Sequence, residues 1–282
     1  MSQFPEKAYK NLEFLNSPAA RPIRILCEYE ETRQRFLAHD IQHTIVFFGS
    51  ARTRSSEDAA WMLEQAQVAA ERNPDDPEVQ LQLRKAQVIH RMSGYYDAAR
   101  ELARRITEWS MGPERRRQYV ISSGGGPGIM EAANRGASDA GGRSIGLGIS
   151  LPFEQGVNDW VTEELAFEFH YFFTRKYWFL YLCKALIIFP GGFGTMDELF
   201  ETLTLVQTGK IKKKLPIVLF GTDYWSKVVN LEAMADFGTI SHQDLDLVYV
   251  TDSVDDAFEY VVTELQKLPQ RSLLTNADEE PE

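Results

Sequence analysis

The sequence reads Ala185-Leu186-Ile187-Ile188-Phe189, then Pro190-Gly191-Gly192-Phe193-Gly194-Thr195-Met196-Asp197-Glu198, then Leu199-Phe200-Glu201-Thr202-Leu203-Thr204-Leu205-Val206. The first segment is an apolar run typical of a buried strand, and the third has the apolar spacing of a helix. The glycine-rich turn between them presents bare backbone amides at the positive end of a helix dipole, where a phosphate binds well. Glu198 adds a carboxylate one helical turn inside that site. The stretch therefore predicts chemistry on a phosphorylated small molecule.

Strands alternate with helices along the rest of the chain. Apolar blocks predict strands at 43–48, 119–123, 144–149, 160–167, 215–220 and 248–250, and helical spacing predicts helices at 23–38, 127–140, 171–184, 223–235 and 255–268. This alternation predicts an α/β fold, a Rossmann-like doubly wound parallel sheet flanked by helices. We expect residues 1–268 to form one domain and the acidic tail 269–282 to be disordered.

The segment 56–109 contains more helix than a crossover between two parallel strands requires. Its two helical pieces, 57–72 and 78–109, are separated by a break at Asn73-Pro74-Asp75-Asp76-Pro77. We interpret about 71–93 as a helical insertion after the first strand, with Gly94 near the point where it rejoins the crossover helix. The insertion is either a flap over the sheet face or an oligomer contact.

Composition restricts the partners. The 282 residues have a formal net charge of −11, so the chain repels nucleic-acid backbones and anionic membranes, and neither is expected as a partner. Cys27 and Cys183 are expected to be buried free thiols, and without a CxxC pair a zinc site is not expected. The N-terminus lacks the apolar core of a signal peptide, and no apolar run has the length of a membrane span. We therefore expect a cytoplasmic protein.

Two glycine-rich turns follow predicted strands, Ser123-Gly124-Gly125-Gly126-Pro127-Gly128 and Gly191-Gly192-Phe193-Gly194-Thr195. Neither has the dinucleotide or P-loop pattern, and one such turn alone could be a tight link without a ligand. Two turns at strand ends of one sheet predict shared phosphate or ribose binding, because ligands of open α/β sheets bind at that edge. The candidate binding residues are Ser50, Gly124, Gly125, Gly126, Gly128, Glu131, Gly191, Gly192, Gly194 and Thr195.

Glu198 and the basic pair Arg175-Lys176 each have two interpretations. Thr195-Met196-Asp197-Glu198 fits a capping box, in which Glu198 only stabilises the helix start, but the same carboxylate also faces the glycine turn. Arg175 and Lys176 stand among seven aromatic residues between Phe169 and Phe179. They lie either on a solvent-facing stripe or in a packed position from which the arginine fork binds an anion. Spacing leaves both questions open.

The residues Gly124-Gly125-Gly126-Pro127-Gly128-Ile129-Met130-Glu131, the pair Arg175-Lys176 and the turn 190–198 resemble the LOG ("Lonely Guy") family. Its members are cytokinin riboside 5′-monophosphate phosphoribohydrolases, often mislabelled "possible lysine decarboxylase". The predicted helix 23–38 resembles that of its longer bacterial members. Every fixed position of the PGGxGTxxE signature is matched, and the resemblance runs from about Ile41 to Leu268, except near 71–93. Lysine decarboxylation would use pyridoxal phosphate, and the sequence around Lys176 and Lys184 has no pyridoxal-type motif.

The resemblance implies hydrolysis of the N-glycosidic bond of a nucleoside 5′-monophosphate, AMP or an N6-modified AMP, to free base and ribose 5-phosphate. It implies that Arg175 and Glu198 are catalytic, that no cofactor or metal is required, and that the chain is a homo-oligomer, dimer or larger. The residues leave open a non-catalytic nucleotide-binding or sensor protein of the same fold, or a scaffold built around the insertion. They also leave open the preferred base, and whether the role is cytokinin biosynthesis or general purine nucleotide breakdown.

Overall fold

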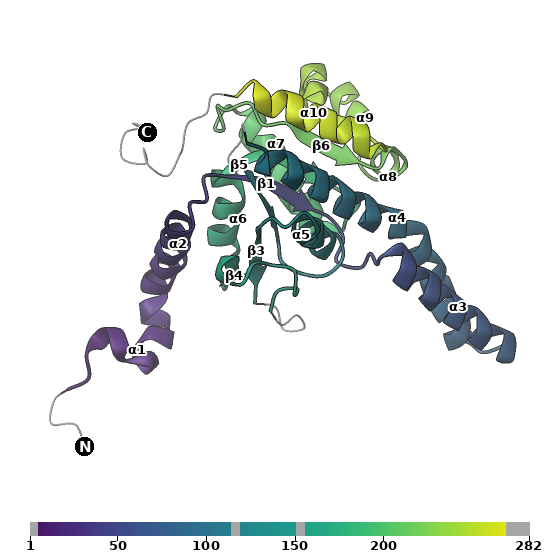
Figure 1. Ribbon diagram of the computed structural model, residues 1–282, viewed down its shortest axis with the longest axis horizontal. Coiled ribbons are helices and arrows are strands. Elements are labelled where there is room, and N and C mark those ends of the chain that lie inside the picture. Colours follow the sequence, from purple (N-terminus) through teal and green to yellow (C-terminus); the bar gives the residue numbers. More distant parts are fainter. Residues whose placement is uncertain (1–4, 114–118, 151–155, 269–282) are drawn as a thin grey trace.

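The computed structural model describes residues 5–113, 119–150 and 156–268. Within these ranges the strands form one parallel seven-stranded sheet in the order β4-β3-β2-β1-β5-β6-β7. The strands are β1 (His43–Phe48), β2 (Tyr119–Ser123), β3 (Ser144–Ile149), β4 (Ala166–Phe169), β5 (Cys183–Ile188), β6 (Ile217–Phe220) and β7 (Tyr249–Thr251). The predicted Rossmann-like α/β class is confirmed (Figure 1).

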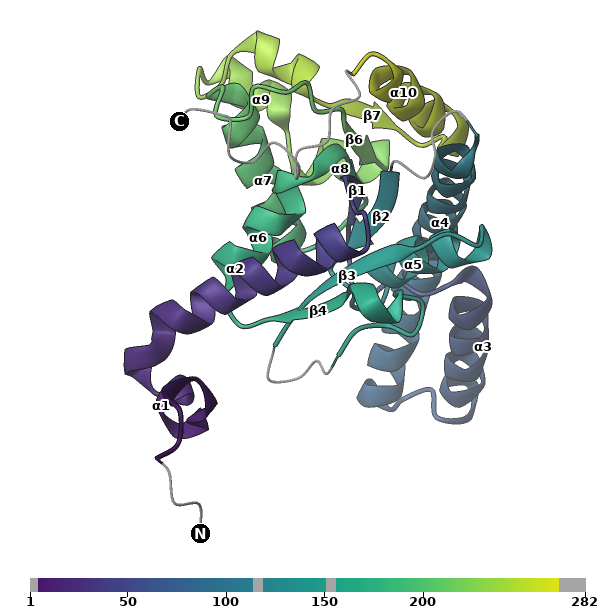
Figure 2. The same ribbon diagram turned by 60° about the vertical axis from the view of Figure 1, so that its left-hand side comes forward.

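Helices cover both faces of the sheet (Figures 1 and 2). One face packs against α4 (Pro77–Met111), α5 (Ile129–Asp139) and α10 (Val254–Gln266). The other packs against α2 (Arg21–Ala38), α6 (Phe172–Tyr181), α7 (Phe193–Gln207) and α8 (Thr222–Val228). The remaining helices are α1 (Leu12–Asn16), α3 (Ser56–Arg72) and α9 (Leu231–Asp236), with 3₁₀ turns at Ala8–Lys10, Pro18–Ala20, Glu163–Leu165 and His242–Leu247.

The central strands are apolar throughout because each of their faces meets a helical layer. In β1, Ile45 and Phe47 join the core under α4 and α5, whereas Val46 and Phe48 join the core under α6 and α7. A strand buried on both faces loses the hydrophobic–polar alternation of a half-exposed strand, which is why these blocks are so apolar. The chain leaves β1 toward β2 on one side, and β5 lies on the other side, so the strand order reverses at β1.

Several predicted boundaries are wrong. The predicted helix 171–184 ends at Tyr181, because Cys183 pairs with Thr44 of β1 and begins β5. The predicted strand 160–167 begins only at Ala166, and the helix predicted from Pro127 begins at Ile129. The predicted helix 223–235 is two helices, since the backbone is extended at Val229 (φ −130°) between α8 and α9.

The cysteine prediction holds for one residue only. Cys183 is buried in β5, but Cys27 on α2 is exposed, because that helix covers only part of the sheet. The tail 269–282 lies outside the described residues, so its predicted disorder stays a prediction. In the described part of the chain, no helix is both long and apolar enough to cross a membrane.

The predicted helical pieces after β1 form a hairpin of α3 and the first half of α4, residues 77–94. The N-caps Ser55 and Asp76 accept hydrogen bonds from backbone amides at the starts of α3 and α4. The predicted break at 73–77 is confirmed, and α4 continues through Gly94 without interruption. This hairpin, 56–94, follows the central strand β1 and projects away from the sheet (Figure 1). Its origin as an insertion, and the single-domain organisation, stay predictions.

Candidate functional site

The two glycine turns follow the carboxyl ends of β2 and β5, the two strands that flank β1 in the sheet. Ser50, in the loop after β1, joins them through its backbone. Its amide donates a hydrogen bond to the carbonyl of Pro190 (2.9 Å), and its carbonyl accepts one from the amide of Ile129 (3.1 Å). Since the strand order reverses at β1, this is the edge where ligands of open α/β sheets bind. The structure therefore brings both turns and Ser50 together.

The first turn, 124–128, approaches the β1 loop so closely that it excludes side chains. A Cβ at Gly128 would lie 2.3 Å from the Ser50 carbonyl oxygen, and Gly128 has a φ of +71°, a conformation that favours glycine. Gly125 has the same φ and has Val157 against it. Gly124 and Gly125 are buried, whereas Gly126 is half-buried.

Asn158 secures this turn, and sequence reasoning missed it. Its Nδ2 amide lies within hydrogen-bond distance of the carbonyls of Gly125 (2.9 Å) and Gly126 (3.0 Å) and of Oδ1 of the fully buried Asn134 (3.0 Å). Asn134 Oδ1 also accepts from the Ser123 hydroxyl (2.7 Å). No local pattern marks Asn158, because its partners are more than twenty residues away in the sequence.

The second turn leads directly into α7. Gly191 has no room for a side chain, since a Cβ there would lie 2.0 Å from Thr195 Oγ1. Gly192 is the N-cap, and Gly192 and Gly194 are exposed with open space beside them. The first amides of a helix lack intrahelical acceptors, so this exposed first turn can donate hydrogen bonds to an anion. The Tyr224 hydroxyl donates to the Gly191 carbonyl and helps to fix the turn.

Glu198 is buried in α7, with 6% of its surface exposed. Among the described residues its Oε2 atom has no hydrogen-bond partner. Burial raises the pKa of Glu198 to about 7, although the nearby positive charges of Arg175 and Lys176 oppose this shift. A carboxyl group with this pKa exchanges its proton near neutral pH, as a catalytic acid or base must.

The capping-box interpretation of Glu198 is wrong. The helix begins at Phe193 with Gly192 as its N-cap, so Thr195 already lies inside the first turn. No side chain caps α7 in the part of the chain that the structure describes. Glu198 therefore does not reach back to a capping threonine.

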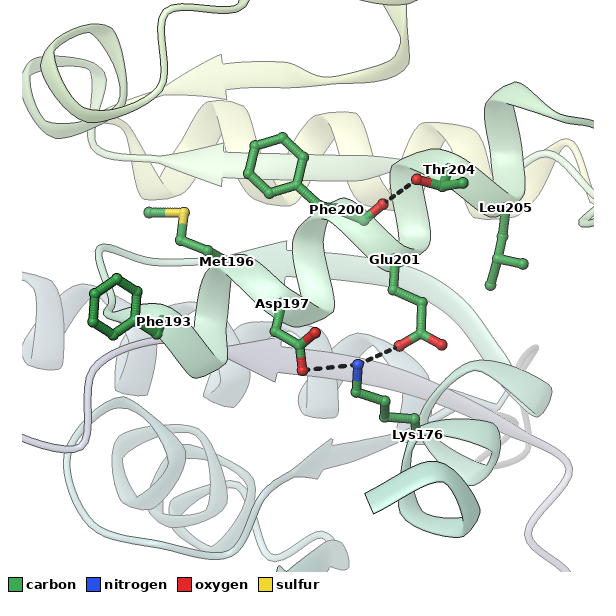
Figure 3. A pocket seen from close by; sticks show the side chains of 8 residues that line it. All are labelled: Lys176, Phe193, Met196, Asp197, Phe200, Glu201, Thr204 and Leu205. Carbon is green, nitrogen blue, oxygen red and sulfur yellow. Dashed lines mark hydrogen bonds and ion pairs between the residues drawn. The ribbon is translucent and has the colours of Figure 1, made fainter.

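The solvent-facing interpretation of Arg175 and Lys176 is also wrong. Arg175 is half-buried, and its Nε donates to the Leu147 carbonyl (2.6 Å). Its Nη2 atom lies so close to Gly124 that a Cβ added to this glycine would be only 2.6 Å away. The guanidinium group thus reaches the first glycine turn. Lys176 links α6 to α7 through ion pairs with Asp197 (2.8 Å) and Glu201 (2.9 Å), as Figure 3 shows.

Glu131 lies on the other side of the first turn, toward α4. Its Oε1 accepts a hydrogen bond from the Tyr96 hydroxyl (2.7 Å). Burial, reinforced by this bond, raises the pKa of Tyr96 to about 12. Glu131 also lines a cavity of about 440 Å³ with Gly125, Gly126 and Trp160. The structure therefore places Glu131 at the first turn, where its carboxylate is hydrogen-bonded to α4.

Two further hollows flank the second turn. A groove of about 520 Å³ runs along the outer side of α7, lined by Phe193, Met196 and Phe200 among others (Figure 3). A larger cavity of about 790 Å³ lies between Ser50, Gly191 and the helical hairpin. Among the residues described, no cluster of three or more His, Cys, Asp or Glu side chains could hold a metal ion.

The fold and the site define a Rossmann-like α/β protein in which two glycine turns meet a buried acid and an arginine. Residues 130–261 match the family model described as "Possible lysine decarboxylase". Together with the relatives below, this match supports membership of the LOG family.

Two curated relatives are similar over about half of this chain. A "Cytokinin riboside 5′-monophosphate phosphoribohydrolase" of Mycobacterium marinum (strain ATCC BAA-535 / M) is 27% identical over 144 residues, which are 50% of this chain and 74% of the relative. The "Cytokinin riboside 5′-monophosphate phosphoribohydrolase LOG" of Oryza sativa subsp. japonica is 31% identical over 134 residues, 47% of this chain and 51% of the relative. The match thus spans about half the length of the rice protein.

A solved X-ray structure, that of TM1055, aligns with a TM-score of 0.47 and 17% identity over 78% of this chain and 99% of its own. The α/β fold class follows from the chain's own sheet topology.

Proposed function

We propose that this chain hydrolyses the N-glycosidic bond of a nucleoside 5′-monophosphate, AMP or an N6-modified AMP, and releases the free base and ribose 5-phosphate. The names of both relatives support this reaction class. The observation that carries the proposal is the buried Glu198 carboxyl group, which has an oxygen without a hydrogen-bond partner among the described residues. It belongs to the same helix start as the second glycine turn and is attracted by Arg175.

In the proposed mechanism the phosphate serves as a handle. The amides of the first turn of α7, with Thr195, bind the 5′-phosphate and position the glycosidic bond. Binding energy from this remote group lowers the barrier only if the reacting carbon is placed beside the catalytic groups. Arg175 orients the phosphate or the Glu198 carboxylate.

Glu198 acts at the ribose in this proposal. Cleavage of a glycosidic bond develops positive charge on the sugar ring, as in glycoside hydrolysis. The carboxylate either stabilises this charge or activates the attacking water. Lysine decarboxylation has less support, since Lys176 is bound by two carboxylates and Lys184 is buried within β5.

Product chromatography of the purified full chain with AMP and N6-modified AMP tests the proposal. We expect release of the base without added metal, and loss of turnover by about 100-fold or more in Glu198→Gln, the order of magnitude of general acid–base catalysis. Glu232→Gln, an exposed carboxylate on α9, is the control and should keep wild-type turnover. Circular dichroism of each variant checks the fold. Full activity of Glu198→Gln would contradict the assignment.

Calorimetry separates this enzyme from the nucleotide-binding alternative. Binding of AMP without base release over hours would identify a nucleotide-binding or sensor protein. Three aromatic residues of the sequence, Phe153, Trp160 and Phe173, could form an apolar pocket for an N6-modified base. Trp160 and Phe173 are both partly exposed, and Phe153 lies outside the described residues, so the preferred base stays open. A cytoplasmic location, a homo-oligomeric state, and a role in cytokinin biosynthesis or purine breakdown stay proposals.

A further inference from the structure

The cavity of about 790 Å³ has walls from three distant parts of the chain. One wall is the β1 loop, residues 50–54. The second consists of Pro190 and Gly191 with Tyr224, and the third is the stretch 84–92 of α4, within the helical hairpin. Neither Arg175 nor Glu198 lines this space. The cavity therefore lies apart from the two catalytic groups of the proposed hydrolysis, although Gly191 of the second glycine turn also lines it.

Five basic side chains line the cavity: Arg52, Arg54, Arg84, Lys85 and Arg91. Across the described ranges, 5–113, 119–150 and 156–268, no carboxylate forms an ion pair with any of them. Of these five, Arg54 alone makes side-chain hydrogen bonds within the described part of the chain, to the carbonyls of Ala51 (3.2 Å) and Thr53 (2.9 Å). This is unusual in a chain of net charge −11, where acidic partners are abundant. Uncompensated like charges around one hollow repel each other and attract a polyanion.

The basic wall comes from one face of α4. Arg84, Val88 and Arg91 follow one another at helical spacing, and Lys85, Ile89 and Met92 form the adjacent row. Residues three or four apart lie on the same side of a helix, so both rows face the cavity together. The apolar members give this wall a surface for an uncharged part of a ligand.

The hairpin is fixed relative to the sheet, so this wall is preformed. The hydroxyl groups of Ser56 and Ser93 lie 3.2 Å apart, joining the start of α3 to α4. The Ser56 amide donates to Asp97 (3.4 Å). Further along α4, Tyr96 is bonded to Glu131 of α5. A site held in place before binding loses less conformational entropy when the ligand arrives.

We propose that this cavity binds a polyphosphate chain, of two or more linked phosphates, either as the free polyanion or as part of a nucleoside di- or triphosphate. Four basic side chains on two walls, which form no hydrogen bond or ion pair with the described residues, match the several negative charges of such a chain better than those of a single phosphate. Arginine predominates among them, and its planar fork suits phosphate oxygens. The site goes beyond the proposed hydrolysis and does not depend on it.

Isothermal titration of the full chain at fixed ionic strength tests this site with tripolyphosphate, ATP and inorganic phosphate as probes. We expect tripolyphosphate and ATP to bind at least about tenfold more tightly than inorganic phosphate, since each additional charge-assisted hydrogen bond strengthens binding. The variant Arg84→Gln/Lys85→Gln/Arg91→Gln should lose about tenfold or more of this affinity.

The control variant Arg72→Gln/Lys210→Gln/Lys212→Gln removes the same charge from exposed positions outside the cavity. It should keep the wild-type affinity, and circular dichroism should show both variants folded. An equal loss of affinity for tripolyphosphate and ATP in both variants, or no loss in Arg84→Gln/Lys85→Gln/Arg91→Gln, would overturn the proposal. Tighter binding of ATP than of tripolyphosphate assigns the ligand to nucleotides, and equal binding assigns it to the phosphate chain alone. The titration needs no turnover, so its outcome is independent of the AMP test.

Discussion

Glu198 is a residue whose position the sequence marks but whose surroundings only the structure shows. The stretch Thr195-Met196-Asp197-Glu198 is compatible with a helix cap because its spacing is correct. The structure starts α7 at Phe193, two residues before Thr195, so the same carboxyl group lies inside the helix and is buried. The positive charge of Arg175, on α6, partly opposes the rise in the pKa of Glu198 that burial causes. The chemistry of Glu198 therefore depends on where the helix begins.

The raised pKa of Glu198 predicts a pH-dependent stability. Because the folded-state pKa is about 7 and the ordinary value is 4.5, the folded state retains this proton over a range where the unfolded state has lost it. Stability is therefore highest below the ordinary value and decreases as the pH rises through about 7. The free energy of unfolding of Glu198→Gln, relative to wild type, should increase by up to about 3 kcal/mol between pH 4.5 and 8.

Urea denaturation at both pH values measures this difference. Glu232→Gln should follow the wild-type pH dependence, because that carboxylate is exposed. Parallel pH profiles of wild type and Glu198→Gln would show that burial does not disfavour the Glu198 charge.

At the scale of elements, α2 positions the helix that carries Arg175. The Glu28 carboxylate on α2 accepts hydrogen bonds from the backbone amides of His170 (2.7 Å) and Tyr171 (3.4 Å) and from the Thr174 hydroxyl. These groups form the N-terminus of α6, where a helix dipole favours a negative charge. Sequence reasoning missed Glu28 because its partners are more than 140 residues away.

Replacing Glu28 should therefore weaken both the fold and the site. We expect Glu28→Gln to lower the free energy of unfolding by about 2 kcal/mol, since it weakens hydrogen bonds to a charged group. Turnover of AMP should decrease as α6 loses its anchor. Glu30→Gln on the same helix is the control, since Glu30 is exposed and its ion pair with Arg33 is long, at 4.0 Å. Equal destabilisation by the two substitutions in urea denaturation would contradict the anchoring role.

Elements were predictable where their pattern is local. The apolar block before the second glycine turn and the helix after it, as well as the break at 73–77, agree with the structure. The end of α6 was not predictable, because Cys183 and Lys184 follow an aromatic helix and belong to β5 only through its pairing with β1. Asn158 and Glu28 were missed for the same reason, since their roles exist only in contact with distant segments.

At the scale of the whole molecule, large aromatic side chains remain uncovered at the starts of α6 and α7. Phe172 (52%), Phe173 (57%) and Phe193 (96%) are exposed, and the Lys176–Asp197 ion pair ties the two helices side by side. Exposed apolar groups gathered in one region are typical of protein–protein contacts. This surface supports the proposed homo-oligomer.

Light scattering coupled to size exclusion tests the oligomer. We expect a dimer or larger assembly for the wild type. The dissociation constant of this assembly should be at least about tenfold higher for Phe173→Ser/Phe193→Ser, since buried aromatics contribute over 1 kcal/mol each. Phe237→Ser, which changes a phenylalanine that is 86% exposed after α9, is the control. A monomeric wild type, or equal dissociation of the control, would contradict the proposed interface.

The sequence by itself determined the α/β class and the position of both glycine turns at strand ends, because apolar periodicity and glycine are local signals that need no partner. Only the tertiary structure decided that Ser50 joins the two turns, that Glu198 is buried with an oxygen lacking a partner among the described residues, and that basic residues of α4 face the β1 loop. Burial and pairing arise from contacts between segments far apart in the chain, and local spacing contains no information about them.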